Sequence, residues 1–296
     1  MQIKRRPFLA CLGAAVLAAC TAAEDVPPER IPKFDPALVG QPRVALVLGG
    51  GGPRGFAHVG VIKVLEEAGI VPDLIVGASV GGMVGALYAG GMKAAELERE
   101  ANALDVVSFF ELSMIGGGLA SGERTQGWVN ERVRGLPMES LATPLVVTAL
   151  RVRDGKLVLF NRGDTGLAVR ASSATPEMFK PVKIGDETYK DGDDASPVPI
   201  HVARSLGARV VIAVDVSAYP ESTPPDAKPE WVAKDARRAA QVAREAPEAD
   251  VLLHPDIGYY AGHSAEYRRR VVAAAESYTR QQLPRIKAAL AKMGSG

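Results

Sequence analysis

Two glycine-rich stretches near the start of the chain carry residues that could do chemistry. One is Gly49-Gly50-Gly51-Gly52-Pro53-Arg54-Gly55, and the other is Gly77-Ala78-Ser79-Val80-Gly81-Gly82. The first would present backbone N–H groups to an anion at a helix N-terminus. The second matches Gly-x-Ser-x-Gly, the pattern of a serine nucleophile held on a sharp turn between a strand and a helix.

The glycine loop by itself leaves three interpretations open. Gly50-x-Gly52-x-x-Gly55 has the spacing of a dinucleotide-binding loop, but the following strand does not end in the acidic residue that would bind a ribose. A P-loop would need Gly-Lys-Ser/Thr, and this loop continues as Gly55-Phe56-Ala57. The third interpretation is an oxyanion hole, which stabilises the negative charge formed during acyl transfer.

The elements around these stretches predict one alternating α/β unit. Residues 43–48 and 74–76 are short apolar runs typical of buried parallel strands, and helical spacing follows each of them, over 56–68 and 80–89. A strand–helix–strand crossover makes parallel neighbours, whose C-terminal loops lie side by side. We therefore expect the glycine loop and Ser79 to meet in one crevice, which favours a nucleophile beside an oxyanion hole.

A serine nucleophile needs a base, and no histidine stands out for that role. An α/β-hydrolase would use a later histidine, so His201, His254 and His263 are candidates by position. None of them stands beside a clear orienting acid. An α/β-hydrolase esterase with a Ser-His-Asp triad and a non-catalytic phosphate- or nucleotide-binding protein both stay open at this point.

Four ordered blocks resemble the patatin-like phospholipase family. They are Gly50–Gly55, Gly77–Gly81, Ala171-Ser172-Ser173-Ala174-Thr175-Pro176 and Tyr189-Lys190-Asp191-Gly192-Asp193. The similarity continues through Pro197-Val198-Pro199 and the strand at 210–215, so that it covers residues 43 to 217 with little gap.

The resemblance implies a three-layer α/β/α fold with a mainly parallel central sheet and a nucleophile elbow. It implies a serine acyl hydrolase that acts on phospholipid or lysophospholipid esters, with Ser79 as nucleophile, Asp191 as its partner in a dyad without histidine, and an acyl-serine intermediate. No cofactor or metal is required. The other site residues that it implies are the oxyanion-hole residues Gly50, Gly51, Gly52 and Arg54 and the motif glycines Gly55, Gly77, Gly81 and Gly192.

Asp193 departs from the family pattern, in which Gly or Ala usually follows Asp-Gly. A negative charge two positions from Asp191 would raise the pKa of that carboxyl. The departure would either strengthen the base or disturb the dyad. Arg54 also has two interpretations: it adds positive potential toward an oxyanion or a lipid phosphate, or it forms a structural ion pair.

The N-terminus predicts an export signal and a lipid anchor. Lys4, Arg5 and Arg6 precede the apolar run 8–19, which is too short to span a hydrocarbon core of about 30 Å. The ending Leu17-Ala18-Ala19-Cys20 resembles the bacterial lipobox. We therefore expect a signal peptide over 1–19, a tether over 20–42 and the catalytic domain over 43–296. Lipid on Cys20 would hold the domain at the bacterial cell envelope, and Thr21 favours the periplasmic face of the outer membrane.

Composition excludes several classes of protein. The 296 residues hold 35 basic and 34 acidic groups, and without the three basic groups of the signal peptide 32 face 34. A nucleic-acid binder would show a clear basic excess. The two cysteines, Cys11 and Cys20, are too few for a disulfide framework or a zinc site. The partners that we expect are a lipid substrate and a membrane surface, with no nucleic acid and no obligate protein partner.

The remaining segments have weaker patterns. Residues 145–150 and 157–160 predict neighbouring strands, and 231–246 and 264–292 predict helices, the second of which Pro284 could break. Residues 105–119 could form an apolar flap over the acyl site or ordinary core with a turn.

Overall fold

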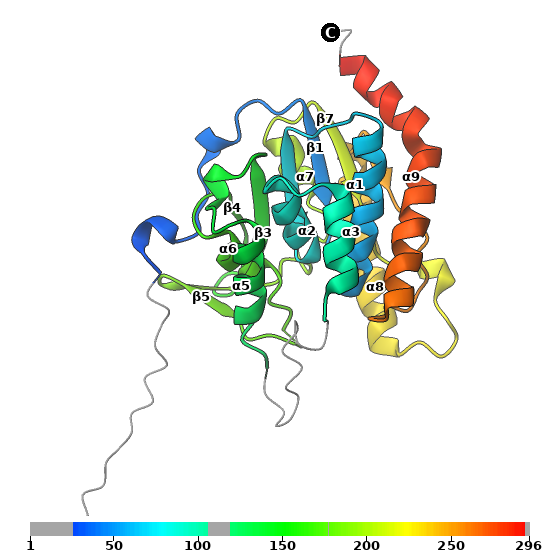
Figure 1. Ribbon diagram of the computed structural model, residues 1–296. Coiled ribbons are helices and arrows are strands. Elements are labelled where there is room, and N and C mark those ends of the chain that lie inside the picture. Colours follow the sequence, from blue (N-terminus) through cyan, green and yellow to red (C-terminus); the bar gives the residue numbers. More distant parts are fainter. Residues whose placement is uncertain (1–25, 106–118, 177, 294–296) are drawn as a thin grey trace, which may run out of the picture.

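Five strands with nearly continuous apolar sequence form the parallel centre of one sheet. They are β1 (Val44–Leu48), β2 (Leu74–Ala78), β3 (Leu145–Arg151), β7 (Val210–Val214) and β8 (Val251–Leu253), and they pair in the order β3-β2-β1-β7-β8. Strands covered on both faces are apolar on both faces, which explains the valine-rich runs. The computed structural model of the protein describes residues 26–105, 119–176 and 178–293 (Figure 1).

Three further strands extend the sheet beyond β3 in antiparallel orientation. β4 (Leu157–Phe160) pairs with Val147–Leu150, and β6 (Glu187–Lys190) pairs with Leu150 and Arg151. β5 (Val182–Ile184) then pairs with β6. The predicted pairing of 145–150 with 157–160 is confirmed. β6 matters most for the site, because Asp191 follows its last residue.

Helices cover both faces of the sheet. One face carries α1 (Ala57–Glu67), α2 (Val80–Ala89), α3 (Ala94–Ala103), α5 (Glu123–Arg132), α6 (Thr165–Ser172) and α9 (Ala265–Met293), and the other carries α7 (Ile200–Ser205) and α8 (Pro229–Glu245). Successive residues of β1 alternate between the two cores, with Leu46 in the first and Ala45 and Val47 in the second. The predicted three-layer α/β/α fold with a mainly parallel sheet is confirmed (Figure 1).

The described part of the predicted tether, residues 26–42, packs on the domain instead of extending freely. Arg30 forms an ion pair of 2.7 Å with Asp164, and the Asp35 N–H donates to the Asn161 side chain at 2.7 Å. Lys33 also forms a β-bridge with Arg162. Proline and charge indicated exposed chain, but these charges have specific partners on the 161–164 loop. The ordered domain therefore includes residues 26–42, whereas Cys20 and residues 106–118 of the expected flap lie outside the described residues.

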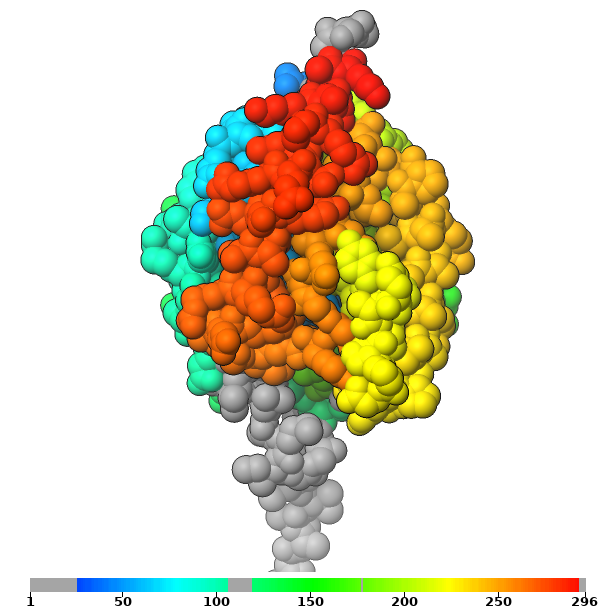
Figure 2. Space-filling model, turned by 90° about the vertical axis from the view of Figure 1, so that its right-hand side faces the viewer, coloured from blue at the N-terminus to red at the C-terminus, as the bar shows by residue number. Residues whose placement is uncertain are grey.

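α9 continues through Pro284 from Ala265 to Met293, so the predicted break is absent. A proline removes one hydrogen bond of a helix, and the fully buried Ile286 just beyond it keeps the following turn on the core. Figure 2 shows α9 along one face of the molecule with the segment that contains α8 beside it. Within the described residues, no helix combines the length and the apolar character needed to cross a bilayer.

Candidate active site

Ser79 occupies a strained turn between β2 and α2, as the Gly-x-Ser-x-Gly pattern predicts. Its φ of 51° and ψ of −124° lie where residues with a side chain are rare. A Cβ at Gly81 would lie 2.1 Å from the Leu48 carbonyl oxygen, and one at Gly77 would lie 2.5 Å from Gly82 Cα. Both glycines are therefore required by close backbone packing, and the turn projects Ser79 from the C-terminal end of the sheet.

The Ser79 hydroxyl donates a hydrogen bond of 2.7 Å to Oδ2 of Asp191. Asp191 is 5% exposed and stands directly after β6. The same Oδ2 accepts from the Thr175 hydroxyl at 3.0 Å, and Oδ1 accepts from the Asp193 N–H at 3.0 Å. These donors fix the carboxylate in place, so a nucleophile and a proton acceptor face each other without an intervening histidine.

The pKa of Asp191 is raised to about 7, by burial first and by the neighbouring Asp193 carboxylate second, while the hydrogen bond from Ser79 opposes the shift. The direction agrees with the effect expected for Asp193. A carboxyl with a pKa near neutrality is a stronger base than an ordinary aspartate and can still release its proton at neutral pH. The shift therefore suits the carboxyl to accept a proton from Ser79.

The glycine loop meets the nucleophile turn, as the sheet order requires. A Cβ at Gly55 would lie 2.4 Å from Val80 Cγ2, and one at Gly81 would lie 2.7 Å from the Gly49 oxygen. β1 and β2 are parallel neighbours, so the loop after β1 and the turn after β2 share one edge. The glycine loop and the nucleophile turn therefore lie against each other, as expected.

Two of the four residues expected in the oxyanion hole have amides bound elsewhere. The Gly50 N–H donates to the Pro197 oxygen at 2.9 Å, and the Arg54 N–H donates to the Gly51 oxygen at 3.2 Å. The Gly51 and Gly52 amides donate to no acceptor among the described residues. Gly51 has a φ of 153° and Gly52 one of 56°, conformations that glycine adopts readily. The geometry thus leaves Gly51 and Gly52 as the available N–H donors.

The Arg54 side chain binds a backbone oxygen. Its Nη2 donates to the backbone oxygen of Tyr259 at 2.5 Å, which ties the glycine loop to the segment before α9. A backbone carbonyl carries no charge, so this contact is structural but is not an ion pair.

The histidines have other partners. The His201 ring lies 3.0 Å from Glu248, and His254 Nε2 lies 3.0 Å from the Ser217 oxygen. His58 is fully buried, which lowers its pKa to about 4, and its Nε2 lies 2.8 Å from the Gly49 oxygen. Because a carbonyl only accepts, the neutral ring carries its proton on Nε2. The Ser79 hydroxyl donates to Asp191 and its N–H donates to Ser172, which does not favour a histidine triad.

An apolar pocket opens beside the glycine loop and the nucleophile turn. It encloses about 590 Å³ including its mouth, and it begins at Gly52 and Val80. Further residues that line it are Met83, Val84 and Leu87 of α2, Leu97 and Ala101 of α3, and Trp128 of α5. The lining carboxylate of Glu100 is paired with Arg132 at 2.7 Å. The lining is therefore largely apolar, and it includes Val80, the residue that follows Ser79.

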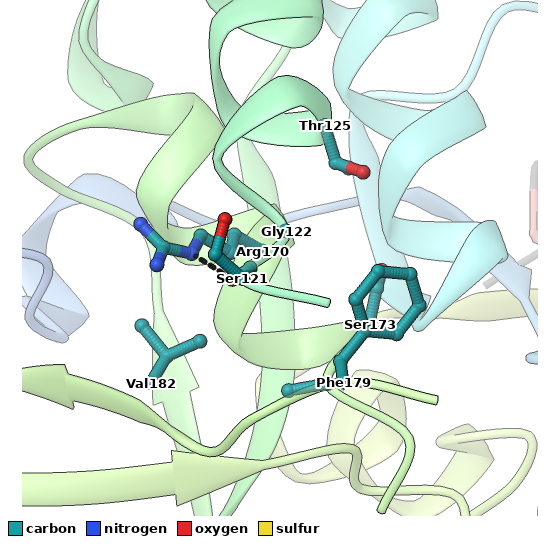
Figure 3. Close-up of a pocket in the computed structure, with 8 residues that line it drawn as sticks. Ser121, Gly122, Thr125, Arg170, Ser173, Phe179 and Val182 are labelled. Carbon is teal, nitrogen blue, oxygen red and sulfur yellow. Dashed lines mark hydrogen bonds between the residues drawn. The ribbon is translucent and has the colours of Figure 1, made fainter. Parts of the chain in front are cut away.

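A second hollow lies on the α6 side (Figure 3) and holds about 200 Å³ of open space. Ser121, Gly122, Arg170, Ser173 and Phe179 are among the residues around it. The Arg170 guanidinium is engaged: its Nε donates to the Ser121 oxygen and its Nη1 to Gln126, each at 2.9 Å. This hollow therefore offers no free cation for an anionic headgroup.

Several residues that support the site were not assigned a role from sequence. Ser172 accepts from the Ser79 N–H at 2.8 Å, and Thr175 holds Asp191. Both lie in the Ala-Ser-x-Ala-x-Pro block, so their position in the motif was the available signal. Arg238 of α8 forms an ion pair of 2.5 Å with Asp193. The Asp193 carboxylate, next to the buried Asp191, needs a cation as its partner. Nothing local in the sequence indicated that this cation is Arg238.

Residues 46–204 match the profile of the family described as patatin-like phospholipase. The chain belongs to this family. Among its patatin-like relatives is an uncharacterized NTE family protein of Mycobacterium tuberculosis, 32% identical over 197 residues, which are 64% of this chain and 55% of that protein. The human patatin-like phospholipase domain-containing protein 6 is 35% identical over 193 residues, 60% of this chain and 14% of that protein.

The chain thus matches only about half the length of the mycobacterial relative and a small part of the human one. Among solved structures, VipD from Legionella pneumophila aligns with a TM-score of 0.49 and 16% identity, covering 86% of this chain and 70% of that chain. The described residues hold no group of three His, Cys, Asp or Glu side chains placed to bind a metal ion.

Proposed function

We propose that this chain is a serine acyl hydrolase that cleaves acyl ester bonds of phospholipids or lysophospholipids. The observation that carries the proposal is the hydrogen bond of 2.7 Å from the Ser79 hydroxyl to the buried Asp191 carboxylate. Membership of the patatin-like phospholipase family supports the same chemistry.

In the first step the Ser79 oxygen attacks the ester carbonyl while its proton passes to Asp191. The carbonyl oxygen becomes an oxyanion, which the Gly51 and Gly52 amides bind in a site pre-organised by the loop. When the tetrahedral intermediate collapses, the leaving alkoxide takes the proton from Asp191. The product alcohol leaves, and the acyl group remains on Ser79 as an ester.

In the second step water attacks the acyl-serine and gives its proton to Asp191. The new tetrahedral intermediate collapses to release the fatty acid, and the Ser79 oxygen recovers its proton from Asp191. Thr175 and the Asp193 N–H keep the carboxylate oriented through both steps. The apolar pocket supports a fatty acyl group as the part of the substrate that is bound.

The test is fatty-acid release by the purified full chain from phosphatidylcholine, lysophosphatidylcholine and p-nitrophenyl esters. The proposal expects release from at least one lipid and its loss in Ser79→Ala. His254→Ala and His201→Ala serve as controls and keep the activity. Equal release by Ser79→Ala and the unchanged protein would refute the proposal, and loss in a histidine variant with retention in Asp191→Asn would favour a triad.

We also propose that lipid on Cys20 holds the domain at the periplasmic face of the outer membrane. The lipobox-like ending of the export signal supports this location. Metabolic incorporation of an alkyne fatty acid tests it: the unchanged chain should take up the label and Cys20→Ala should not. Equal labelling of both would contradict the anchor.

A further inference from the structure

Two buried side chains hold the carbonyl oxygens of the glycine loop. His58 Nε2 donates to the Gly49 oxygen at 2.8 Å, and Arg238 Nη2 donates to the Gly50 oxygen at 2.7 Å. The His58 contact is short-range, from the first turn of α1. The Arg238 contact reaches across 188 positions from α8, outside the segment that matches the family profile.

The Arg238 contact sets the direction of the next amide. In a trans peptide the C=O and N–H groups point in opposite directions. Because Arg238 holds the Gly50 oxygen on the α8 side, the N–H of Gly51 points to the other side of the loop. That N–H is one of the two donors left available for an oxyanion.

The same guanidinium is bound to the loop that carries Asp191. Its Nη1 lies 2.5 Å from Asp193 Oδ2, and its Nη2 lies 4.0 Å from Asp215 Oδ1. The Asp193 N–H in turn donates to Asp191. A Cβ at Gly50 would lie 1.9 Å from Asp193 Oδ1, so the Asp193 carboxylate lies directly against the glycine loop. Arg238, 11% exposed in its side chain, therefore joins the oxyanion loop to the loop of the base.

The face of α8 that meets these loops is mostly polar. Gln241 donates to the Asp194 oxygen, and Glu245 accepts from the Ser196 hydroxyl and the His201 N–H, each at 2.8 Å. Val242 is the one apolar side chain of α8 that is buried. Apolar burial therefore contributes little to docking this helix, and directional polar contacts place it against residues 193–201.

We propose that Arg238 is a positioning residue that orients the Gly50–Gly51 peptide for oxyanion binding and registers the glycine loop against the Asp191 loop. The inference rests on the proposed function for its effect on rate, but the anchoring itself can be measured without substrate. In a merely structural role, Arg238 would only neutralise the partly buried charge of Asp193.

The two roles separate in a double variant. Arg238→Met alone leaves the partly buried Asp193 without its cation, which is destabilising under either role. Asp193→Gly with Arg238→Met removes the Asp193 charge and its cation together, while the Gly50 oxygen still lacks its donor. Asp215, 4.0 Å from the guanidinium, keeps its hydrogen bonds from the Ser217 N–H and hydroxyl. Asp193→Gly alone is the reference, because it keeps the contact of Arg238 with Gly50. Arg237→Met, on an exposed residue of the same helix, is the matched control.

The experiment measures kcat and KM on a p-nitrophenyl ester, the melting temperature, and amide hydrogen exchange of the 49–56 segment. If Arg238 orients the loop, the double variant melts near Asp193→Gly but has kcat lower by about 100-fold, the size of losing one oxyanion donor. KM changes less than about 3-fold, because the missing interaction acts in the transition state. The 49–56 amides exchange faster than in Asp193→Gly, and Arg237→Met behaves as the unchanged protein.

A double variant with the kcat and the exchange of Asp193→Gly would overturn the inference and leave Arg238 a charge-balancing role. If the double variant does not fold, Arg238→Lys replaces it: lysine keeps the cation facing Asp193 but lacks the second nitrogen that spans to Gly50. The inference then expects lower kcat and faster 49–56 exchange at an unchanged melting temperature, and wild-type values would refute it. If Ser79→Ala hydrolyses as fast as the unchanged protein, the proposed function fails, while the exchange data still decide whether Arg238 anchors the loop.

Discussion

The Ser79 hydroxyl and the Asp191 carboxylate lie 2.7 Å apart although 112 positions separate them in the chain. Ser79 is delivered by the turn after β2, and Asp191 by the end of β6, which pairs with the C-terminal end of β3. β3 is the parallel neighbour of β2. The sheet order therefore brings a nucleophile and a base to one edge, beside the glycine loop that follows β1.

Replacing Asp191 by Asn should abolish most of the acyl transfer. The amide keeps the size of the carboxyl but cannot accept the Ser79 proton, and general-base catalysis contributes about 10²–10⁴-fold. We expect kcat on a p-nitrophenyl ester to fall within that range with the circular dichroism spectrum unchanged. Retention of more than about a tenth of the activity would show that another group is the base.

Activity should depend on pH through the ionisation of Asp191. The carboxyl must be ionised to accept a proton, and its pKa is raised to about 7 by burial first and by Asp193 second. The charged groups that face it are Asp193 from its own loop and Arg238 from α8, with the Ser79 and Thr175 hydroxyls as neutral donors. We therefore expect kcat/KM to rise as pH rises through about 7.

Asp193→Gly should move the rise of kcat/KM to lower pH, because it removes the repulsion that raises the pKa of Asp191. The matched control is Asp194→Gly, which removes a charge at a more exposed position. A profile that Asp193→Gly leaves in place would show that burial alone sets the pKa.

Stability should show the opposite pH dependence from activity. Asp191 has a higher pKa in the folded chain than the 3.8 of a free aspartate, so the fold prefers the protonated form. The stabilisation is complete below the unfolded pKa and is lost as pH rises toward about 7. The free energy of unfolding in urea should fall between pH 4 and pH 7, and less steeply in Asp191→Asn, which stays neutral. Equal slopes would contradict the raised pKa.

The acyl pocket predicts a change in chain-length preference. Ala101→Trp would place a large side chain into the pocket between α3 and α5, which should shorten the preferred acyl chain. We expect the rate ratio of p-nitrophenyl butyrate to palmitate to rise at least about 10-fold, since each buried methylene contributes about 0.8 kcal/mol. Ala103→Trp, on an exposed position of the same helix, is the control and should leave the ratio unchanged. A ratio that Ala101→Trp does not alter would place the acyl chain elsewhere.

The nucleophile turn should not tolerate a side chain at Gly81. A methyl group there would meet the Leu48 backbone oxygen at 2.1 Å, and overpacking of this kind costs about 1–3 kcal/mol. Gly127→Ala is the control in α5, where nothing lies within 4 Å of the added Cβ, and it should gain up to about 1 kcal/mol. Thermal melting compares the two. A Gly81→Ala variant as stable as the unchanged chain would refute the close approach.

Local sequence predicted the parts of the site that depend on local geometry. Gly77, Ser79 and Gly81 indicated the strained turn because each requirement lies within five residues, and the apolar runs around them indicated parallel strands. Asp191 came from the resemblance to a family, since a carboxylate that meets Ser79 only through the sheet order has no local signal. The choice of Gly51 and Gly52 over Gly50 and Arg54 also needed the structure, because it depends on which amides bind Pro197 and Gly51.

Contacts between residues far apart in the chain could not be predicted from local sequence, because the partners meet only in the fold. Arg238 reaches Asp193 and Gly50 from a helix that in sequence is an ordinary charged helix. The sequence predicts a tether over 20–42, and the partners of Arg30 and Asp35 on the 161–164 loop appear only when the chain is folded. The partner of a charged residue depends on tertiary structure, and residue spacing along the chain does not reveal it.

The central claim is that Ser79 becomes acylated with Asp191 as the base, and trapping the intermediate tests it most directly. The full chain is mixed with a p-nitrophenyl ester, quenched in acid within one turnover, and examined by intact mass and peptide mapping. The account predicts one acyl group on Ser79 in the unchanged chain and in His254→Ala, and no adduct within that time in Asp191→Asn. An adduct on another residue, or undiminished acylation of Ser79 in Asp191→Asn, would contradict it.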